Sequence, residues 1–179
     1  MREPSKAIES LATLLQESGA KPVLVPSRLA PSAIYDLEYR TAVICLVFDA
    51  FAKAQAGSID RKISAARLKF LQFISIRPWL LPAIQEWGQE SEQSSLGLAY
   101  SVRIRRGFLS DTAYEDVMNF LVACRVFVRD GGQIALGAKG GEVERISKEV
   151  QTRDLFVSER ETIADLGDIK ITNNMLEGW

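Results

Sequence analysis

The chain has 179 residues, of which 47% are hydrophobic and 25% are charged, and its formal net charge is −1. This length corresponds to about one domain, which can bury a core without disulfides or structural metals. A net charge near zero excludes a strong overall attraction to nucleic acid or anionic lipid. The charge is uneven, because residues 140–179 carry 5 basic and 9 acidic side chains while the rest is mildly basic.

Residues 1–34 form the first of three predicted segments. Apolar residues at helical spacing predict a helix over residues 7–17, and three prolines then indicate an extended connector. The N-terminus lacks the apolar stretch of a secretory signal, and no segment approaches the roughly 18 apolar residues of a membrane span. We therefore expect a cytoplasmic protein that does not contact the membrane.

The second segment, residues 35–150, should form the core. Its first helix is predicted over residues 37–55, with an acidic first turn at Asp36 and Glu38 that suits the helix dipole. Apolar residues cover nearly every side of this helix, so we expect it to be central and buried.

A second helix is predicted over residues 62–75, with Ser58 or Asp60 as its N-cap. A short helix over residues 79–87 and an exposed polar loop over residues 88–95 should follow.

Residues 100–104 predict a strand, and residues 112–123 predict a third core helix. A β-hairpin is then predicted over residues 125–137. Its apolar alternation surrounds an Asp-Gly-Gly turn that supplies the positive φ values of a tight hairpin.

A charged helix is predicted over residues 142–151. The third segment, residues 151–179, is an acidic C-terminal tail that should pack on the core or extend from it, with a strand at residues 169–172. Cys45 and Cys124 lie in apolar runs and are interpreted as reduced core thiols, with a disulfide or a reactive thiol as the alternative.

The sequence contains no histidine, the commonest general base and a frequent metal ligand. Residues 137–141 are glycine-rich but do not match a phosphate loop, because Lys139 precedes Gly140. We predict no catalytic residues, no metal site and no cofactor, and we expect the protein not to be an enzyme. An enzyme that uses carboxylates and a metal is the alternative, since adjacent carboxylates such as Glu115 and Asp116 do occur.

Two basic clusters are candidates for contacts with DNA or a protein partner, although such residues also serve as solvated surface. They are Arg61, Lys62, Arg67 and Lys69, and then Arg103, Arg105 and Arg106. Trp79 and Trp87 are interpreted as core residues, with interface anchoring as the alternative, and the terminal Trp179 is a candidate docking aromatic.

The order of helices followed by a hairpin predicts a mainly α fold with a small β-hairpin, arranged as a winged-helix-like domain with extra helices. In a DNA-reading winged helix, the helix before the hairpin should carry Arg, Lys, Asn or Gln on its outer face. Here that face presents Thr112, Glu115, Asp116 and Asn119. Its two carboxylates favour protein contact over sequence-specific readout of DNA.

Three stretches, EYRTAVICLVFDAFAKA, RPWL and AYEDVMNFLVACRVFVRDGGQIALG, give the chain a resemblance to a family over roughly residues 35–140. They are similar to the small middle components of three-component ABC-ATPase systems of bacterial antiviral defence, including Lamassu-type systems. The resemblance implies a winged-helix adaptor that is similar to the accessory subunits of SMC complexes. Such an adaptor bridges an SMC- or Rad50-like ATPase to an effector subunit and touches DNA without sequence specificity. A DNA-binding winged-helix transcriptional regulator is the alternative.

Overall fold

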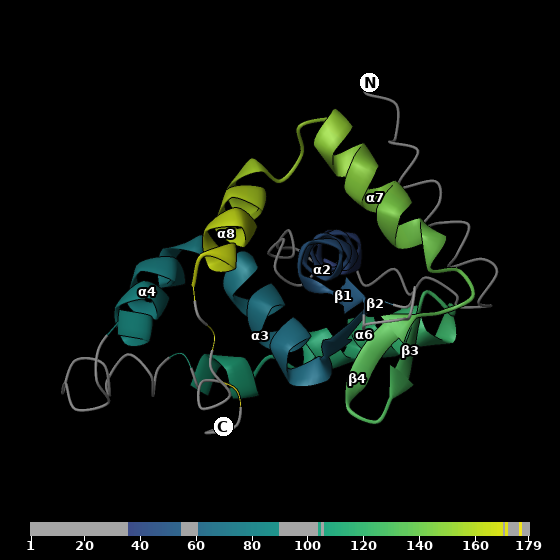
Figure 1. Ribbon diagram of the computed structural model, residues 1–179, viewed down its shortest axis with the longest axis horizontal. Helices are drawn as coiled ribbons and strands as arrows, with labels where there is room; N and C mark the ends of the chain where they lie inside the picture. The colour runs from purple at the N-terminus through teal and green to yellow at the C-terminus, as the bar shows by residue number, and fades with distance from the viewer. Residues whose placement is uncertain are drawn as a thin grey trace, which may run out of the picture.

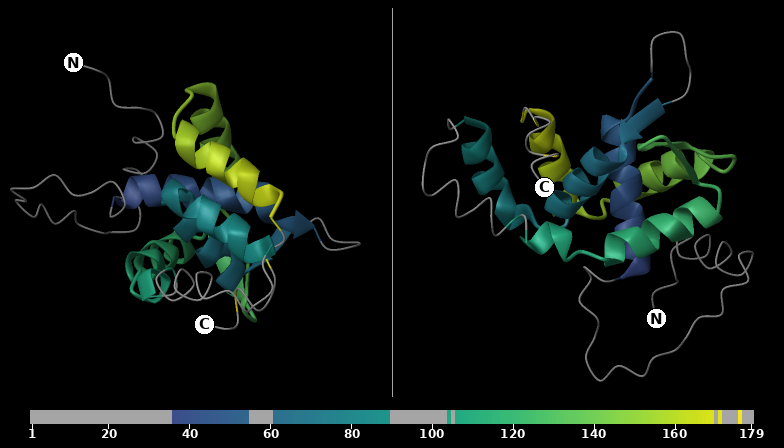
Figure 2. Two further views of the ribbon diagram at one scale, coloured as in Figure 1. Left: turned by 90° about the vertical axis from the view of Figure 1, so that its left-hand side faces the viewer. Right: turned by 90° about the horizontal axis from the view of Figure 1, so that it is seen from below.

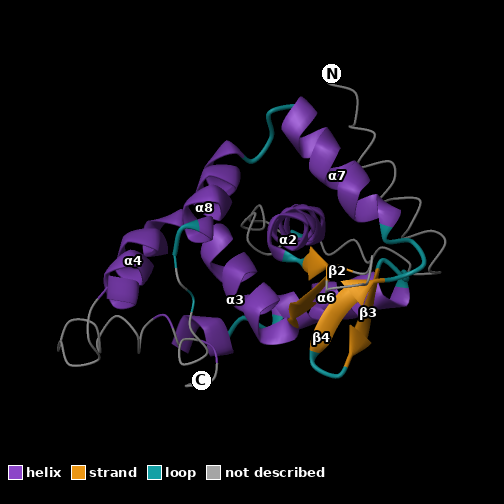
Figure 3. Cartoon of the chain, in the orientation of Figure 1, coloured by secondary structure: helices purple, strands orange, loops and turns teal. Residues whose placement is uncertain are grey.

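The computed structural model describes residues 36–54, 61–89, 104, 106–169, 171 and 176. Over these residues the chain is mainly helical, with a small four-stranded antiparallel sheet at one side (Figure 1, Figure 3). The helix and the connector predicted within residues 1–34 lie outside the described residues.

Helix α2, Leu37–Phe51, runs through the centre of the fold and is viewed end-on in Figure 1. The Asp36 carboxylate caps it by accepting a hydrogen bond from the Tyr39 backbone N–H at 2.9 Å. Residues 40–48 are all buried, which confirms the prediction of a central, buried helix. The helix ends before residue 55, because the chain leaves it to form strand β1, Lys53–Ala54.

Strand β2, Arg61–Ser64, corrects the prediction that a helix begins at residue 62. Residues 62–64 of this strand pair with residues 133–135 of a later strand. Their backbone groups therefore form hydrogen bonds across the sheet and not along a helix. Helix α3, Ala65–Ser75, begins after them, where the Ser64 hydroxyl accepts a hydrogen bond from the Arg67 N–H at 3.1 Å. The N-cap is therefore Ser64 and neither Ser58 nor Asp60.

Two elements replace the single helix predicted over residues 79–87. They are the 3₁₀ helix η2, Pro78–Leu80, and helix α4, Leu81–Gln89, which starts with a proline at its second position. Ile104 is helical, so the strand predicted over residues 100–104 is wrong at that residue; the other four residues lie outside the described part of the chain.

Helix α6, Ala113–Ala123, matches the predicted third core helix and lies across α2 in the right-hand view of Figure 2. Strands β3, Phe127–Asp130, and β4, Gln133–Leu136, form the predicted hairpin. The turn between them uses Gly131 and Gly132 at φ values of 53° and 82°. These values lie in the left-handed region that glycine adopts without steric cost.

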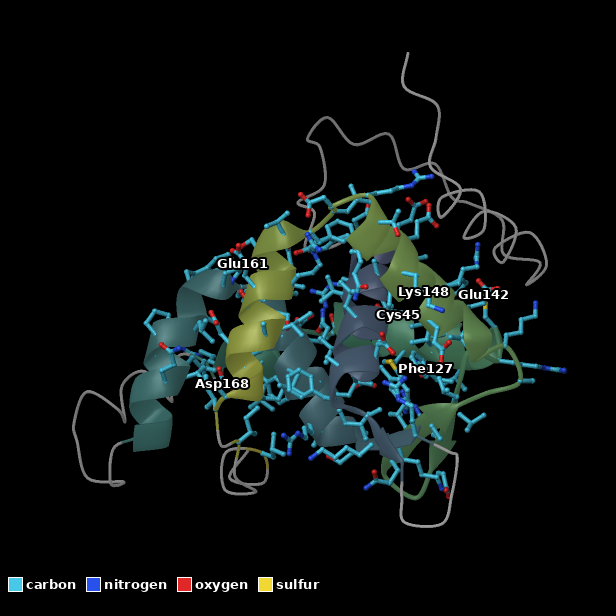
Figure 4. All side chains as sticks on the ribbon, turned by 45° about the horizontal axis from the view of Figure 1, so that its top comes forward. Cys45, Phe127, Glu142, Lys148, Glu161 and Asp168 are labelled. Atoms are coloured by element: carbon cyan, nitrogen blue, oxygen red, sulfur yellow. The ribbon has the colours of Figure 1, made fainter. Side chains whose placement is uncertain are left out.

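The sheet has the strand order β1-β2-β4-β3, so the strand before α3 pairs with the second strand of the hairpin. The Phe127 ring packs against the Phe48 ring of α2, with 4.9 Å between the ring centroids, and both side chains are fully buried. Cys45 of α2 lies in the same interior, as the labels in Figure 4 show. Cys45 and Cys124 are both buried thiols, as the sequence predicts.

Helix α7, Gly141–Thr152, confirms the predicted charged helix and packs along α2. Helix α8, Val157–Gly167, lies inside the acidic C-terminal segment, where only a strand at residues 169–172 was predicted. It packs against α3 and α2 and buries Thr162, Ile163 and Leu166. The strand predicted at residues 169–172 is not formed at either of its described residues, Ile169 and Ile171.

A buried ion-pair network joins α2 to the segment that leads into α6. Asp111 Oδ1 lies 2.9 Å from Arg40 Nη2, and Asp111 Oδ2 accepts a hydrogen bond from Arg77 Nη1 at 3.4 Å. The Arg40 side chain is fully buried and that of Asp111 is 3% exposed. A buried charge requires an oppositely charged partner, so this network fixes α2, the turn after α3 and the segment before α6 relative to one another.

Candidate functional site

A groove of about 380 Å³ lies between α3, α6 and the tip of the β3–β4 hairpin. Its position follows from the local start of α3, because the Ala65 N–H donates a hydrogen bond to the Gly132 carbonyl oxygen at 2.9 Å. This bond holds the first turn of α3 beside the hairpin turn. The apolar part of the lining comes from Ala65, Ala66, Met118 and Ile134.

The polar part of the groove is a three-residue charge cluster consisting of Lys69, Glu115 and Arg129. Lys69 Nζ lies 3.2 Å from Glu115 Oε1, and Arg129 Nη2 lies 3.2 Å from Glu115 Oε2. Arg129 also donates a hydrogen bond to Asn119 Oδ1 at 3.2 Å. The Glu115 carboxylate therefore pairs with two cations, Lys69 of α3 and Arg129 of β3.

The ammonium of Lys69 lies close to two aromatic rings. Its Nζ lies 5.1 Å from the centroid of the Phe108 ring and 5.7 Å from the centroid of the Tyr114 ring. Both distances fall within the range of cation–π attraction, which holds the ammonium over these faces.

Tyr114 lines the groove and is 3% exposed. Burial raises the pKa of its phenol, the Glu115 carboxylate raises that pKa further, and Arg129 opposes the shift. The phenol therefore keeps its proton in the ordinary pH range. Within the described residues, the buried Tyr114 hydroxyl has no hydrogen-bond partner.

The structure divides the first predicted basic cluster among separate acidic partners. Arg61 pairs with Asp49 at 2.8 Å, and Lys62 Nζ pairs with Asp130 Oδ2 at 2.8 Å. The hydrogen bond from Lys62 lowers the pKa of the Asp130 carboxyl. Arg61 also hydrogen bonds to backbone carbonyls at the end of α2 and lies 5.8 Å from the Phe48 ring centroid.

Lys69 belongs to the charge cluster of the groove, and only Arg67 of this first set forms no ion pair within the described part of the chain. In the second set, Arg106 is exposed, whereas Arg103 and Arg105 lie outside the described residues. The structure thus brings one predicted contact residue, Lys69, into the groove. Arg129 and Tyr114 were missed as site residues, because nothing in the sequence around them indicates that they converge with Lys69.

The tryptophans differ from their predicted roles. Trp79 is 65% exposed on η2, so its interpretation as a core residue is wrong. Trp79 is the middle residue of η2, Pro78–Leu80, and none of the three residues of this helix is buried. Trp87 lies in α4, but its side chain is outside the described part of the structure, as is the whole of Trp179.

The described residues contain no group of three or more His, Cys, Asp or Glu side chains placed to hold a metal ion. They also contain no helix that is both long and apolar enough to cross a membrane. The glycine-rich stretch that follows the hairpin is closely packed at Gly137. A Cβ on Gly137 would lie 2.3 Å from the Arg125 carbonyl oxygen, and the Lys139 N–H donates to that same oxygen at 2.9 Å.

Comparisons with family models, with curated proteins and with solved structures find no match to the chain. The chemistry of the groove and of the surrounding surface is therefore the basis for a functional assignment.

Proposed function

We propose that the chain is a non-catalytic adaptor with winged-helix architecture, which binds a protein partner through the face formed by α3, α6 and the β3–β4 hairpin. The order of elements supports the winged-helix assignment. Helix α2, strand β2, helices α3 and α6 and the hairpin follow one another, and β2 pairs with β4. In this arrangement the hairpin is the wing, and α4 belongs to an insertion between α3 and α6.

The observation that carries the proposal is the mixed charge of the outer face of α6, where the exposed carboxylate of Asp116 lies beside the paired Glu115. Glu115 already binds the cations of Lys69 and Arg129, and Asp116 is exposed beside it. A helix that enters a DNA groove meets phosphates on both sides, and they repel the exposed carboxylate of Asp116. The same mixed-charge face can bind a protein surface, because a protein partner can place a positive or a negative side chain opposite each charge.

The resemblance to the middle components of bacterial antiviral systems suggests who the partners are. In this proposal the adaptor bridges an SMC- or Rad50-like ATPase to an effector subunit and contacts DNA only without sequence specificity. The ion pairs beside α3 support a limited role for DNA, because Arg61 and Lys62 are each neutralised by a carboxylate within the chain.

An affinity pull-down of the tagged full chain from its native host tests the proposal. We expect a large coiled-coil ATPase to be identified by mass spectrometry and to remain bound when the wash is raised to high salt. Recovery of the chain alone or as a homodimer, with DNA that is released as salt rises, would instead support a DNA-binding regulator.

A further inference from the structure

The charge cluster of the groove has more positive than negative charge. Lys69 and Arg129 contribute two cations, and Glu115 contributes the one carboxylate that both of them contact. Asp130 of the hairpin does not contribute to this balance, since it pairs with Lys62 on β2. Asp116 follows Glu115 on α6 but does not line the groove. One further carboxylate placed in the groove would balance the cluster.

The cations stand next to an apolar surface. Ala65 and Ala66 of α3 face Met118 of α6 and Ile134 of β4 across the same groove. Sites that combine an apolar floor with a few placed charges recognise amphipathic ligands, because the floor supplies binding energy and the charges fix orientation.

A further feature of the groove lining is the buried hydroxyl of Tyr114. Its hydroxyl is buried and lacks a hydrogen-bond partner within the described residues, although its side chain lines the groove. An unsatisfied buried hydroxyl is unfavourable, and an acceptor that enters beside the ring relieves this cost.

We propose that the groove binds a short segment of the partner protein in which an acidic side chain lies next to an apolar one. The acidic group pairs with Lys69 and Arg129, and the apolar group packs on Met118 and Ile134. This inference rests on the proposed function and names the chemistry of the partner segment. A nucleic-acid backbone is less suitable, because its closely spaced phosphates would extend beyond the two cations towards the exposed Asp116 outside the groove.

Fluorescence anisotropy with the full chain tests this chemistry. The probe is a fluorescein-labelled peptide of twelve residues that alternates leucine and glutamate, and its control replaces every glutamate with glutamine. We expect the glutamine peptide to bind about tenfold more weakly, as for the loss of one charge-assisted contact.

Ala66 offers a matched pair of variants, because it is exposed on α3 and lines the groove. Ala66→Glu places a carboxylate in the groove, whereas Ala66→Lys adds similar bulk with the opposite charge. Both residues favour helix, so the fold is retained and circular dichroism verifies it. We expect Ala66→Glu to weaken binding of the leucine–glutamate peptide about tenfold and Ala66→Lys to retain it.

Three results would overturn the inference: equal affinity for the two peptides, equal loss in the two Ala66 variants, or displacement of the peptide by a duplex DNA of twenty base pairs. The pull-down separates this inference from the proposed function. If the wild-type chain and Ala66→Glu retain the same partner, the groove is not the docking site although the adaptor role stands. If the wild-type chain retains no partner, the adaptor role itself fails.

Discussion

Replacing Asp111, which lies just before α6, with asparagine should strongly destabilise the protein. The Asp111 carboxylate contacts Arg40 at 2.9 Å and Arg77 at 3.4 Å, and it is almost completely buried. Asparagine keeps the volume but removes the negative charge that compensates the buried guanidinium of Arg40. Removing one partner of a buried ion pair costs about 3–5 kcal/mol, a large part of the total stability of about 5–15 kcal/mol that a domain has.

Urea unfolding followed by circular dichroism measures this loss. With a denaturant slope of about 2 kcal/mol per molar, the midpoint for Asp111→Asn should fall by about 2 M. Asp116→Asn is the matched control, because Asp116 is exposed, forms no ion pair with another described residue, and should change stability by less than about 0.5 kcal/mol. Equal midpoints for the two variants would refute the structural role of the buried network. Arg40→Met added to Asp111→Asn should recover part of the loss, because methionine at position 40 leaves no buried guanidinium without a compensating charge.

Three further predictions concern single side chains. Gly137→Ala should destabilise the protein by at least about 2 kcal/mol in the same urea assay, since its Cβ would clash with the Arg125 carbonyl oxygen. Gly167→Ala is the control, because its Cβ would meet nothing within 4 Å, and it should be neutral or stabilising. Ser64→Ala should cost about 1 kcal/mol by removing the N-cap of α3, whereas Ser64→Asp should retain it. Burial raises the pKa of the Cys45 thiol from 9.0 to about 12, with smaller contributions from Asp49 and Glu142. The contribution of the protonated Cys45 thiol to the free energy of unfolding is therefore complete below pH 9 and is lost as the pH rises towards 12. Between pH 9 and pH 10 the free energy of unfolding should fall less steeply in Cys45→Ala than in wild type, and an unchanged pH profile would contradict this assignment.

The sequence alone determines the elements whose signals are local. An apolar surface on every side of residues 37–51 can only be buried by surrounding elements, so α2 had to be central. The Asp-Gly-Gly turn specifies the hairpin in the same way, because few residues other than glycine adopt the φ values of Gly131 and Gly132. The acidic outer face of α6 also follows from helical spacing.

Pairings between distant residues are decided only by the tertiary structure. Arg61–Ser64 is too short to be recognised as a strand, and it becomes one because β4, about 70 residues later, supplies its hydrogen bonds. Arg40 and Asp111 look like surface residues in the sequence, since a charge is buried only when a partner is present to compensate it. The groove depends on three charges at positions 69, 115 and 129, which converge only after α3, α6 and the hairpin have packed around α2.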